Sequence, residues 1–422
     1  MWNTLVQAWK IKEVRNSLIF VGLMMVLFRL FANIPLPGID VAALKHFIES
    51  NQALGMLNLF SGGTLESFSV VAMGVAPYIT ASIIFQLLGM IVPKIEEIQK
   101  DGEAGRAKIN QWTRLATVPL AIIQSISIIS LMRSSSTRIM TDTSLLTYVG
   151  IVMTVTAGTV FLMWIGELIT ERKVGNGISL LIFAGIISGL PSTLSNAYAS
   201  YDSSQLMMWL GYAAMAVVTV LGVVFITEAQ RNIPIQYARQ VHGMGGGVSS
   251  SLPLRILMAG VIPIIFAVSF LIFPTMIAQF LLQAKTAWVA DAARWVVTTL
   301  QNQTIYGALY FILVVAFTYF YTSVIFKPDQ IAENLQKQGG FVPGIRPGEP
   351  TAQYLQHVIT RVTMAGSLFL GAIAILPIII QAFNGTTAYA IGGTSLLIVV
   401  SVVIESVKQI ESHVTMREYE VY

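Results

Sequence analysis

Few side chains in this sequence have the types and spacing that chemistry requires. The four histidines are scattered over separate loops and the C-terminal tail, and none pairs with a carboxylate at helical spacing on an apolar run: His46, His242, His357 and His413. The chain has no cysteine, which excludes disulfides, thiolate metal sites and cysteine nucleophiles. The phosphate-binding loop, the H-E-x-x-H helix and the G-x-S-x-G elbow are absent too. We therefore expect no enzyme activity, no metal site and no cofactor.

Charges inside the apolar runs are equally rare. Glu167, Glu228 and Glu405 stand near the ends of runs, and the relay of intramembrane acids that a proton-coupled carrier needs is missing. Arg29 is the exception, because a charge at depth costs about 2.5 to 3.5 kcal/mol on insertion scales. Two interpretations stay open: its side chain reaches the outer interface, or it pairs within the helical bundle. Neither makes it catalytic.

The elements that carry these residues are membrane spans. Hydrophobic residues make up 55% and charged residues 11% of the 422-residue chain, against about 25% charged in an average soluble domain. Runs of about 18 or more residues with few charges predict ten transmembrane helices. They cover roughly 17–34, 73–92, 115–132, 145–170, 177–197, 205–227, 256–283, 304–326, 362–383 and 388–407.

Basic residues predict the orientation of these spans. Of the 25 Lys and Arg residues, nineteen lie on one side, Arg29 lies within a span, and five lie on the other side: Lys45, Arg133, Arg138, Lys285 and Arg294. Because the basic side of a membrane protein faces the cytosol, both ends of the chain are expected there.

The spans divide into an N-terminal half, 1–200, and a C-terminal half, 201–422. Five spans in each half permit the inverted symmetry of many transport folds, although no clear sequence repeat links them. The longest cytosolic segments, about 228–255 and 327–361, are rich in Gly and Pro and contain a few apolar residues. They predict ordered turns or protruding hairpins.

Helix-breaking residues interrupt several spans: Pro77, the GNG at 175–177, Pro263 and the GGTS at 392–395. A freed backbone group must find a partner in protein or water, so broken helices favour a water-lined interior. Proline and glycine are also more frequent in membrane helices in general, and no single position decides the matter.

Seven stretches, in order, cover nearly the whole chain: FRLFANIPLPGID (28–40), LFSGGTLESFSVVAMGVAPYITASIIFQLL (59–88), DGEAGRAKINQWTR (101–114), GNGISLLIFAGIISGLP (175–191), LPLRILMAGVIPIIFA (252–267), IAENLQKQGGFVPGIRPGEPTAQYL (331–355) and IGGTSLLIVVSVV (391–403). Together they closely resemble the SecY/Sec61 family of protein-conducting channels, in its bacterial SecY branch. The resemblance implies an all-α polytopic membrane protein. Its ten transmembrane helices would form two pseudo-symmetric five-helix halves, a clamshell around an hourglass pore, with a re-entrant plug helix.

The resemblance also implies which residues form the waist of the pore. Carried over by motif, a ring of bulky aliphatic side chains comprises Ile79, Ile83, Ile178, Ile182, Ile265 and Ile398. Such side chains make a dry constriction that resists ions by dewetting. Spacing alone proves nothing, since isoleucine pairs at i and i+4 share a face on any lipid-facing helix.

A sideways opening to lipid is implied between the second and seventh spans. Its lining is Ile84, Gln86 and Phe273, with Gln124 and Asn176 as polar residues near the seam. Gln124 and Asn176 fit ordinary hydrogen bonding between helices equally well.

The stretch NLFSGGTLESFSV, 58–70, is too polar for a span and apolar enough to be buried. In the family this position is the plug, a short helix that folds back into the outer funnel. The resemblance implies re-entry at Gly62 and Gly63, a face toward the ring made by Leu65, Phe68 and Val70, and a face toward water made by Glu66, Ser67 and Ser69. An external loop lying on the bundle is the alternative.

The cytosolic loops are implied to dock partners, through Arg346 in PGIRPG, supported by Arg231, Arg239 and Arg255. Such residues suit ribosomal RNA phosphates and anionic lipid heads alike. The implied partners are the small SecE and SecG membrane subunits, the SecA motor ATPase, the ribosome, signal peptides and nascent chains, and membrane lipids.

The expected function is the central pore-forming subunit of the Sec translocase in the bacterial cytoplasmic membrane. It would be a passive gated channel for secretion of unfolded polypeptides and for lateral insertion of membrane proteins. An ion-coupled secondary transporter with inverted repeats is the alternative, and uptake of a small solute without any motor would favour it.

Overall fold

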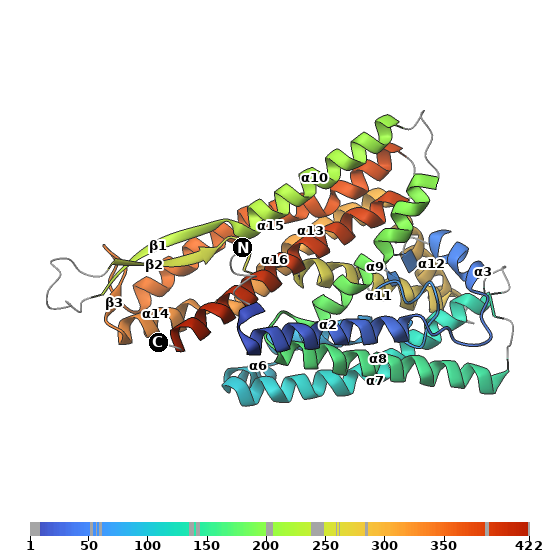
Figure 1. Ribbon diagram of the computed structural model, residues 1–422, viewed down its shortest axis with the longest axis horizontal. Helices are drawn as coiled ribbons and strands as arrows, with labels where there is room; N and C mark the ends of the chain where they lie inside the picture. The colour runs from blue at the N-terminus through green and yellow to red at the C-terminus, as the bar shows by residue number, and fades with distance from the viewer. Residues whose placement is uncertain are drawn as a thin grey trace.

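The computed structural model describes residues 9–50, 54–55, 57–58, 61–134, 139–140, 144–199, 206–237, 249–258, 260, 262–282, 286–384 and 388–420. Within these ranges the chain is mostly helical (Figure 1). The helices are α2 (Lys12–Ala32), α3 (Val41–Ser50), α5 (Ala76–Ile91), α6 (Pro93–Lys100), α7 (Gly102–Ser134), α8 (Leu145–Glu171), α9 (Gly177–Ala199), α10 (Leu206–Glu228), α11 (Ile262–Leu281), α12 (Ala287–Gln301), α13 (Gln303–Ile325), α14 (Pro328–Lys337), α15 (Glu349–Asn384) and α16 (Ala388–Glu420). The strands are β1 (Gln230–Tyr237), β2 (Ser249–Arg255) and β3 (Gly340–Phe341).

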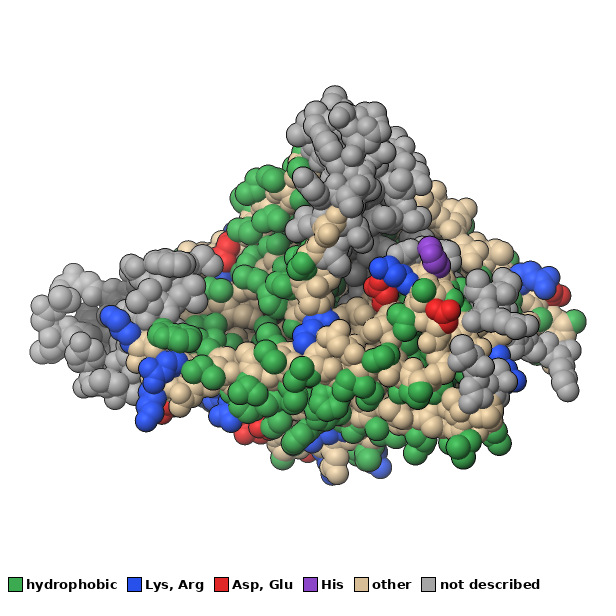
Figure 2. All heavy atoms as spheres, turned by 45° about the vertical axis from the view of Figure 1, so that its right-hand side comes forward, with side chains coloured by type: hydrophobic (Ala, Val, Ile, Leu, Met, Phe, Trp, Pro, Cys, Tyr) green, Lys and Arg blue, Asp and Glu red, His purple; other side chains and the backbone are tan. Residues whose placement is uncertain are grey.

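Each of the ten predicted spans falls on one long helix, namely α2, α5, α7, α8, α9, α10, α11, α13, α15 or α16. Among the described residues, six helices are long and apolar enough to cross a membrane. A seventh is added if α5 and α6, which meet at an angle of 107°, count as one span. Apolar side chains cover much of the described surface in Figure 2, as expected for a chain whose solvent is lipid. The chain is a multi-pass membrane protein.

The long helices form two groups (Figure 1). In one group α5 packs on α7, α7 on α8, and α8 on α9; in the other α13 packs on α11 and α15, and α16 packs on α10 and α15. The groups meet where α11 packs against α5 and α7, and where α16 packs against α9. The interior between the two groups is therefore bounded by α5, α9, α11 and α16.

One apolar core runs through both groups of helices. Its largest fully buried side chains include Phe28 of α2, Leu162 of α8 and Tyr310 of α13. Several buried threonines in the helices donate to the carbonyl four residues earlier, as Thr318 does to Val314 over 2.6 Å. This local bond satisfies a hydroxyl where no water is available.

A three-stranded sheet, in the order β2-β1-β3, departs from the all-α prediction. β1 and β2 are antiparallel, with Gln230 opposite Arg255 and Gln236 opposite Ser249. Ile233 and Ile235 alternate with exposed residues along β1 and are buried, which is the period of a strand with one covered face. The hairpin predicted at 228–255 is therefore confirmed, and the all-α class is corrected to mostly helical.

The segment 327–361 does not form a hairpin by itself. It consists of α14, the short strand β3, a run of turns and the first turns of α15. β3 pairs with β1, with Phe341 opposite Gln236, and Val342 joins Ile233, Leu254 and Leu355 in a small separate core. This core joins the two predicted cytosolic loops into one unit at one end of the molecule (Figure 1).

Candidate functional site

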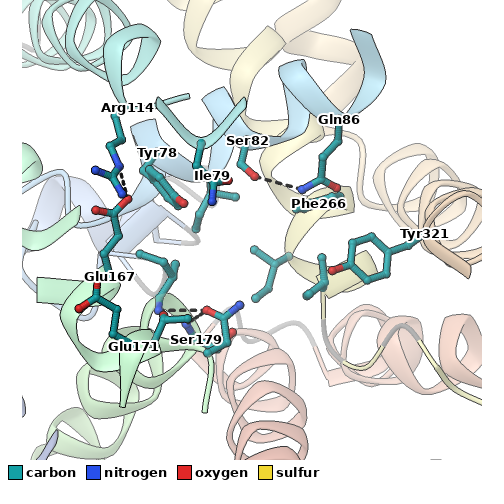
Figure 3. A pocket seen from close by; sticks show the side chains of 16 residues that line it. Tyr78, Ile79, Ser82, Gln86, Arg114, Glu167, Glu171, Ser179, Phe266 and Tyr321 are labelled. Carbon is teal, nitrogen blue, oxygen red and sulfur yellow. Dashed lines mark hydrogen bonds and ion pairs between the residues drawn. The ribbon is translucent and has the colours of Figure 1, made fainter. Parts of the chain in front are cut away.

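A cavity of about 370 Å³ lies between the two groups of helices. Its polar lining is Tyr78, Ser82, Gln86, Asn110, Arg114, Glu167, Thr170, Glu171, Asn176, Ser179 and Tyr321, and its apolar lining is Ile79, Ile178, Ile262, Ile265 and Phe266. The walls come from α5, α7, α8, α9, α11 and α13. Figure 3 shows Glu167 and Glu171 on one side and Tyr321 on the opposite side, with Ile79 between them.

Arg114 and Glu167 form the closest ion pair of the cavity wall. The Arg114 Nε atom donates to Glu167 Oε1 over 2.6 Å, and the carboxylate side chain is only 19% exposed (Figure 3). The pair joins α7 to α8 across 53 positions of sequence. It fixes one wall of the cavity, and no motif in the sequence pointed to it.

Asn176 begins α9 at the cavity wall. Its Oδ1 accepts from the backbone N–H groups of Ile178 and Ser179, at 3.1 and 3.2 Å, which is the bonding of a helix N-cap. The Thr170 hydroxyl accepts from the N–H of Gly177 over 2.9 Å and ties the end of α8 to this turn. Asn176, predicted near the seam, thus orients the first turn of α9, where Ile178 and Ser179 line the cavity.

The six isoleucines predicted for the ring come from α5, α9, α11 and α16. Five are buried in the continuous core, namely Ile79, Ile83, Ile182, Ile265 and Ile398, and the half-buried Ile178 packs against it. Three of them also line the cavity, namely Ile79, Ile178 and Ile265. The cavity therefore borders apolar side chains from three different helices.

The seam between α5, α7 and α11 contains a small void of about 10 Å³. Gln124 and Phe273 both line it, together with Thr80 and Ile272. Of the other residues predicted for the sideways opening, Ile84 is 37% exposed on α5, and Gln86 lies in the cavity, where it donates to Ser82 over 3.1 Å.

Two of the residues predicted for the sideways opening have a buried amide oxygen without a hydrogen-bond donor within the described part of the chain. The atoms are Oε1 of Gln86 and Oε1 of Gln124. A buried polar atom without a partner destabilises the arrangement that buries it. The contact of α11 with α5 and α7 is therefore held mainly by apolar packing.

The predicted plug segment, 58–70, is described except at 59 and 60. Residues 61–75 form consecutive turns, so the helix expected here is wrong for this stretch; helix is present only at 54–55 and 57–58. Gly62 and Gly63 both take a φ of 78°, and Phe68 takes a φ of 39°. A right-handed helix requires negative φ values, and three positive values within seven residues prevent it.

The segment is held by backbone bonds to the residues that follow α2. Leu36 N–H donates to Phe68 O and Val70 N–H donates to Ile34 O, both over 3.0 Å. Leu65 and Phe68 are buried and Val70 is half-buried. Ser69, expected to face water, is fully buried.

The side chain of Glu66 is 38% exposed and lies at the surface of this segment. Its Oε1 is 3.0 Å from Nζ of Lys45 on α3, and its N–H donates to Oδ1 of Asn58 over 3.0 Å. No spacing in the sequence predicts the pairing of Glu66 with Lys45, because the two residues lie in different elements.

Of the two interpretations of Arg29, the structure shows the pairing of its side chain within the helical bundle. Its Nη2 atom donates to the carbonyl oxygens of Ala184 and Gly185 in α9, at 2.8 and 2.6 Å. The partners are backbone atoms, which leave no signature in a sequence.

Three of the four arginines predicted for docking lie in or near the strands of the sheet. Arg231 on β1, Arg255 at the end of β2 and Arg346 between β3 and α15 are all exposed. Arg239 lies outside the described residues. Among the described residues, no group of three or more His, Cys, Asp or Glu side chains is placed to hold a metal ion.

A family model described as SecY matches residues 69–407. The chain belongs to the SecY family. Full-length relatives are the protein translocase subunits SecY of Streptomyces scabiei, 40% identical, and of Staphylococcus epidermidis, 44% identical. The first match covers 100% of this chain and 99% of the relative, and the second covers 99% of each.

Solved structures share the SecY fold. A protein-conducting channel matches with a TM-score of 0.64 at 18% identity, covering 93% of this chain and 91% of the other. Sec61 in the canine ribosome-channel complex matches with a TM-score of 0.60 at 17% identity, with the same coverage of both chains. The chain is thus a SecY-type subunit of a protein translocase and not itself an enzyme.

Proposed function

We propose that the chain is the central pore of its translocase, a passive gated channel that lets unfolded polypeptides cross the membrane and lets apolar segments leave sideways into lipid. The observation that carries the proposal is the cavity between the helix groups. Its polar lining suits an extended polypeptide in water, and it borders Ile79, Ile178 and Ile265 from three different helices. A partner would supply the energy.

The six isoleucines from α5, α9, α11 and α16 form the waist of this pore. The support for this assignment is that five of them belong to one apolar core that runs through both helix groups, and Ile178 packs against it. A constriction of β-branched side chains excludes ions because water leaves it, while rotamer changes accommodate a passing chain.

The sideways exit lies between α5 and α11, with Ile84, Gln86, Gln124 and Phe273 along it. The support is the small void lined by Gln124 and Phe273 and the two amide oxygens without a donor. When an apolar segment enters the seam, its apolar contacts replace those of α11 with α5 and α7. The free energy needed to separate the helices is therefore smaller there than at a contact held by hydrogen bonds.

Residues 58–70 act as the plug that seals the pore on the outer side. Their support is the burial of Leu65 and Phe68 and the contact of the segment with α9, where Gly62 meets Gly185. Turns, rather than a helix, carry the apolar side chains.

The two halves, 1–200 and 201–422, move as the leaves of a clamshell with all ten spans across the bacterial cytoplasmic membrane and both termini in the cytosol. Small SecE-like and SecG-like subunits surround them. The unit made of β1, β2, β3 and α14 docks the SecA motor or the ribosome, and the exposed Arg346, Arg231 and Arg255 support this assignment. A ribosome-bound complex is known for structural neighbours, as in the yeast Ssh1 complex on the 80S ribosome.

A disulfide across the seam tests the exit. Thr80 of α5 and Phe273 of α11 line the same void, and the absence of native cysteine makes the pair Thr80→Cys with Phe273→Cys unique in the chain. Oxidation should stop translocation of a secretory protein in reconstituted vesicles, and reduction should restore it. Each single variant, treated with the same oxidant, is the control.

Transport that continues with the cross-link complete would contradict the exit between α5 and α11. Loss of transport in the single variants would assign the effect to the substitutions and not to the bridge. An ion-coupled carrier predicts a different result, uptake of a small solute by the reconstituted chain without any motor.

A further inference from the structure

We propose that Arg29 is a positioning residue for the plug segment, because it holds the part of α9 on which that segment is seated. This inference rests on the proposed sealing role of residues 58–70. The hydrogen bonds of Arg29 go to the backbone of α9, so it acts on the segment through that helix.

Arg29 donates hydrogen bonds to the backbone of α9. Its Nη2 atom donates to Ala184 O over 2.8 Å and to Gly185 O over 2.6 Å, across more than 150 positions of sequence. Its guanidinium carbon lies 5.2 Å from the ring centroid of Phe28. Among the described residues Arg29 forms no ion pair, so two carbonyl dipoles and one ring face offset its charge.

The carbonyl that Arg29 holds belongs to the residue that receives the plug segment. A Cβ atom on Gly62 would lie 2.9 Å from the Cα of Gly185 and 3.1 Å from the Cζ of Phe28. A Cβ atom on Gly185 would overlap the backbone of Gly62. The two backbones therefore touch directly, with Phe28 of α2 closing the third side of the junction.

This geometry explains why an arginine stands inside a span. Its Nε atom is buried without a partner within the described residues, which destabilises the site. A residue needed only to fill space between α2 and α9 would be apolar. A hydrogen-bond donor on α2 fixes the position of α9 along its axis relative to α2. That position decides whether Gly185 of α9 lies opposite Gly62 of the plug segment.

The rate at which a cysteine in the plug segment is chemically labelled measures how often the segment leaves its contact with α9. Ser69, fully buried in the plug segment, becomes a nearly isosteric reporter as Ser69→Cys in a chain without cysteine. The reagent is a membrane-impermeant maleimide added to the outer side of vesicles that contain the purified translocase. Ser367→Cys on α15, also fully buried, reports loosening of the fold elsewhere.

Arg29→Met, which keeps the apolar stem and removes the donors, should raise the labelling rate of Ser69→Cys on the order of tenfold and leave Ser367→Cys unreactive. Arg29→Lys should give an intermediate rate, since one compact ammonium replaces the planar fork. Arg172→Met is the matched control, because Arg172 also contacts α2, 4.3 Å over the ring of Phe20, and does not touch the junction.

An unchanged labelling rate of Ser69→Cys in Arg29→Met overturns the proposal. So does an equal rise at Ser69→Cys and Ser367→Cys, which would make Arg29 a general structural residue. The sealing role is tested separately by deleting residues 61–70 and measuring ion conductance. If that deletion causes no leak, the plug function fails, while the labelling result still decides whether Arg29 positions the segment.

Discussion

Replacing Gly185 with alanine sets two effects of opposite sign against each other. Alanine stabilises a helix interior by about 1 kcal/mol relative to glycine, which on its own would stabilise α9. The added Cβ, however, would overlap the Cα, C and O atoms of Gly62. Overpacking of this kind typically costs about 1–3 kcal/mol.

The upper part of that range applies here, because the obstacle is backbone and not the end of a flexible side chain. Because α9 is helical whether or not the segment is seated, the gain in helix propensity cancels between these two states, and the clash disfavours the seated plug segment by roughly 2 to 3 kcal/mol, a factor of about 30 to 160 in its population. The segment should yield and not α9, since α9 packs on both α8 and α16. The plug segment, by contrast, consists of turns and not of a helix, and its backbone bonds to Ile34 and Leu36 are two in number.

The assay is the resting ion conductance of the translocase in a planar bilayer, together with its thermal unfolding. Gly189→Ala is the matched control, four residues along the same helix, where an added Cβ would meet nothing within 4 Å. We expect Gly185→Ala to leak and Gly189→Ala to stay closed with equal or higher thermal stability. If Gly185→Ala is as tight and as stable as Gly189→Ala, the contact between Gly62 and Gly185 does not seat the plug.

Three further predictions use other contacts. Lys45→Ala removes the 3.0 Å pair with the half-exposed Glu66. The equilibrium between the seated and the released plug segment, read from the resting conductance, should therefore shift by less than about 1 kcal/mol. The difference from the unsubstituted chain should vanish in about 1 M salt. Asn176→Ala removes the N-cap of α9 and should lower the free energy of unfolding by about 1 kcal/mol, whereas Asn176→Asp, which keeps the acceptor, should not. Arg346→Glu, at an exposed turn, should weaken ribosome binding and reduce its salt dependence by about one phosphate contact, with unchanged thermal stability.

The positions of the long helices were predictable because hydropathy is a local property of the sequence. Every predicted span falls on a helix. The hairpin at β1 and β2 was also predictable, since Ile233 and Ile235 alternate with polar residues. The all-α class was wrong because it followed from the resemblance alone and overrode that local pattern.

The contacts that build the site were not predictable from spacing. Arg114 and Glu167 stand 53 positions apart, and each alone looks like an ordinary charge near the end of a span. Arg29 binds carbonyl oxygens, which every residue possesses, so nothing in the sequence marks Ala184 and Gly185 as its partners. Pairings of this kind follow from the packing of α7 on α8 and of α2 on α9, which appears only in three dimensions.

The plug segment shows how the departure from a helix bears on function. A helix resists local change because its bonds form cooperatively, whereas residues 61–75 are successive turns. Phe68 adds to this, since a non-glycine residue in the left-handed region is strained by about 1–3 kcal/mol, and its φ is 39°. Release of the segment breaks the bonds to Ile34 and Leu36 and the exposed pair of Lys45 with Glu66, but it also relieves that strain. We therefore expect the closed and released states to differ by only a few kcal/mol, small enough for an entering polypeptide to shift the balance.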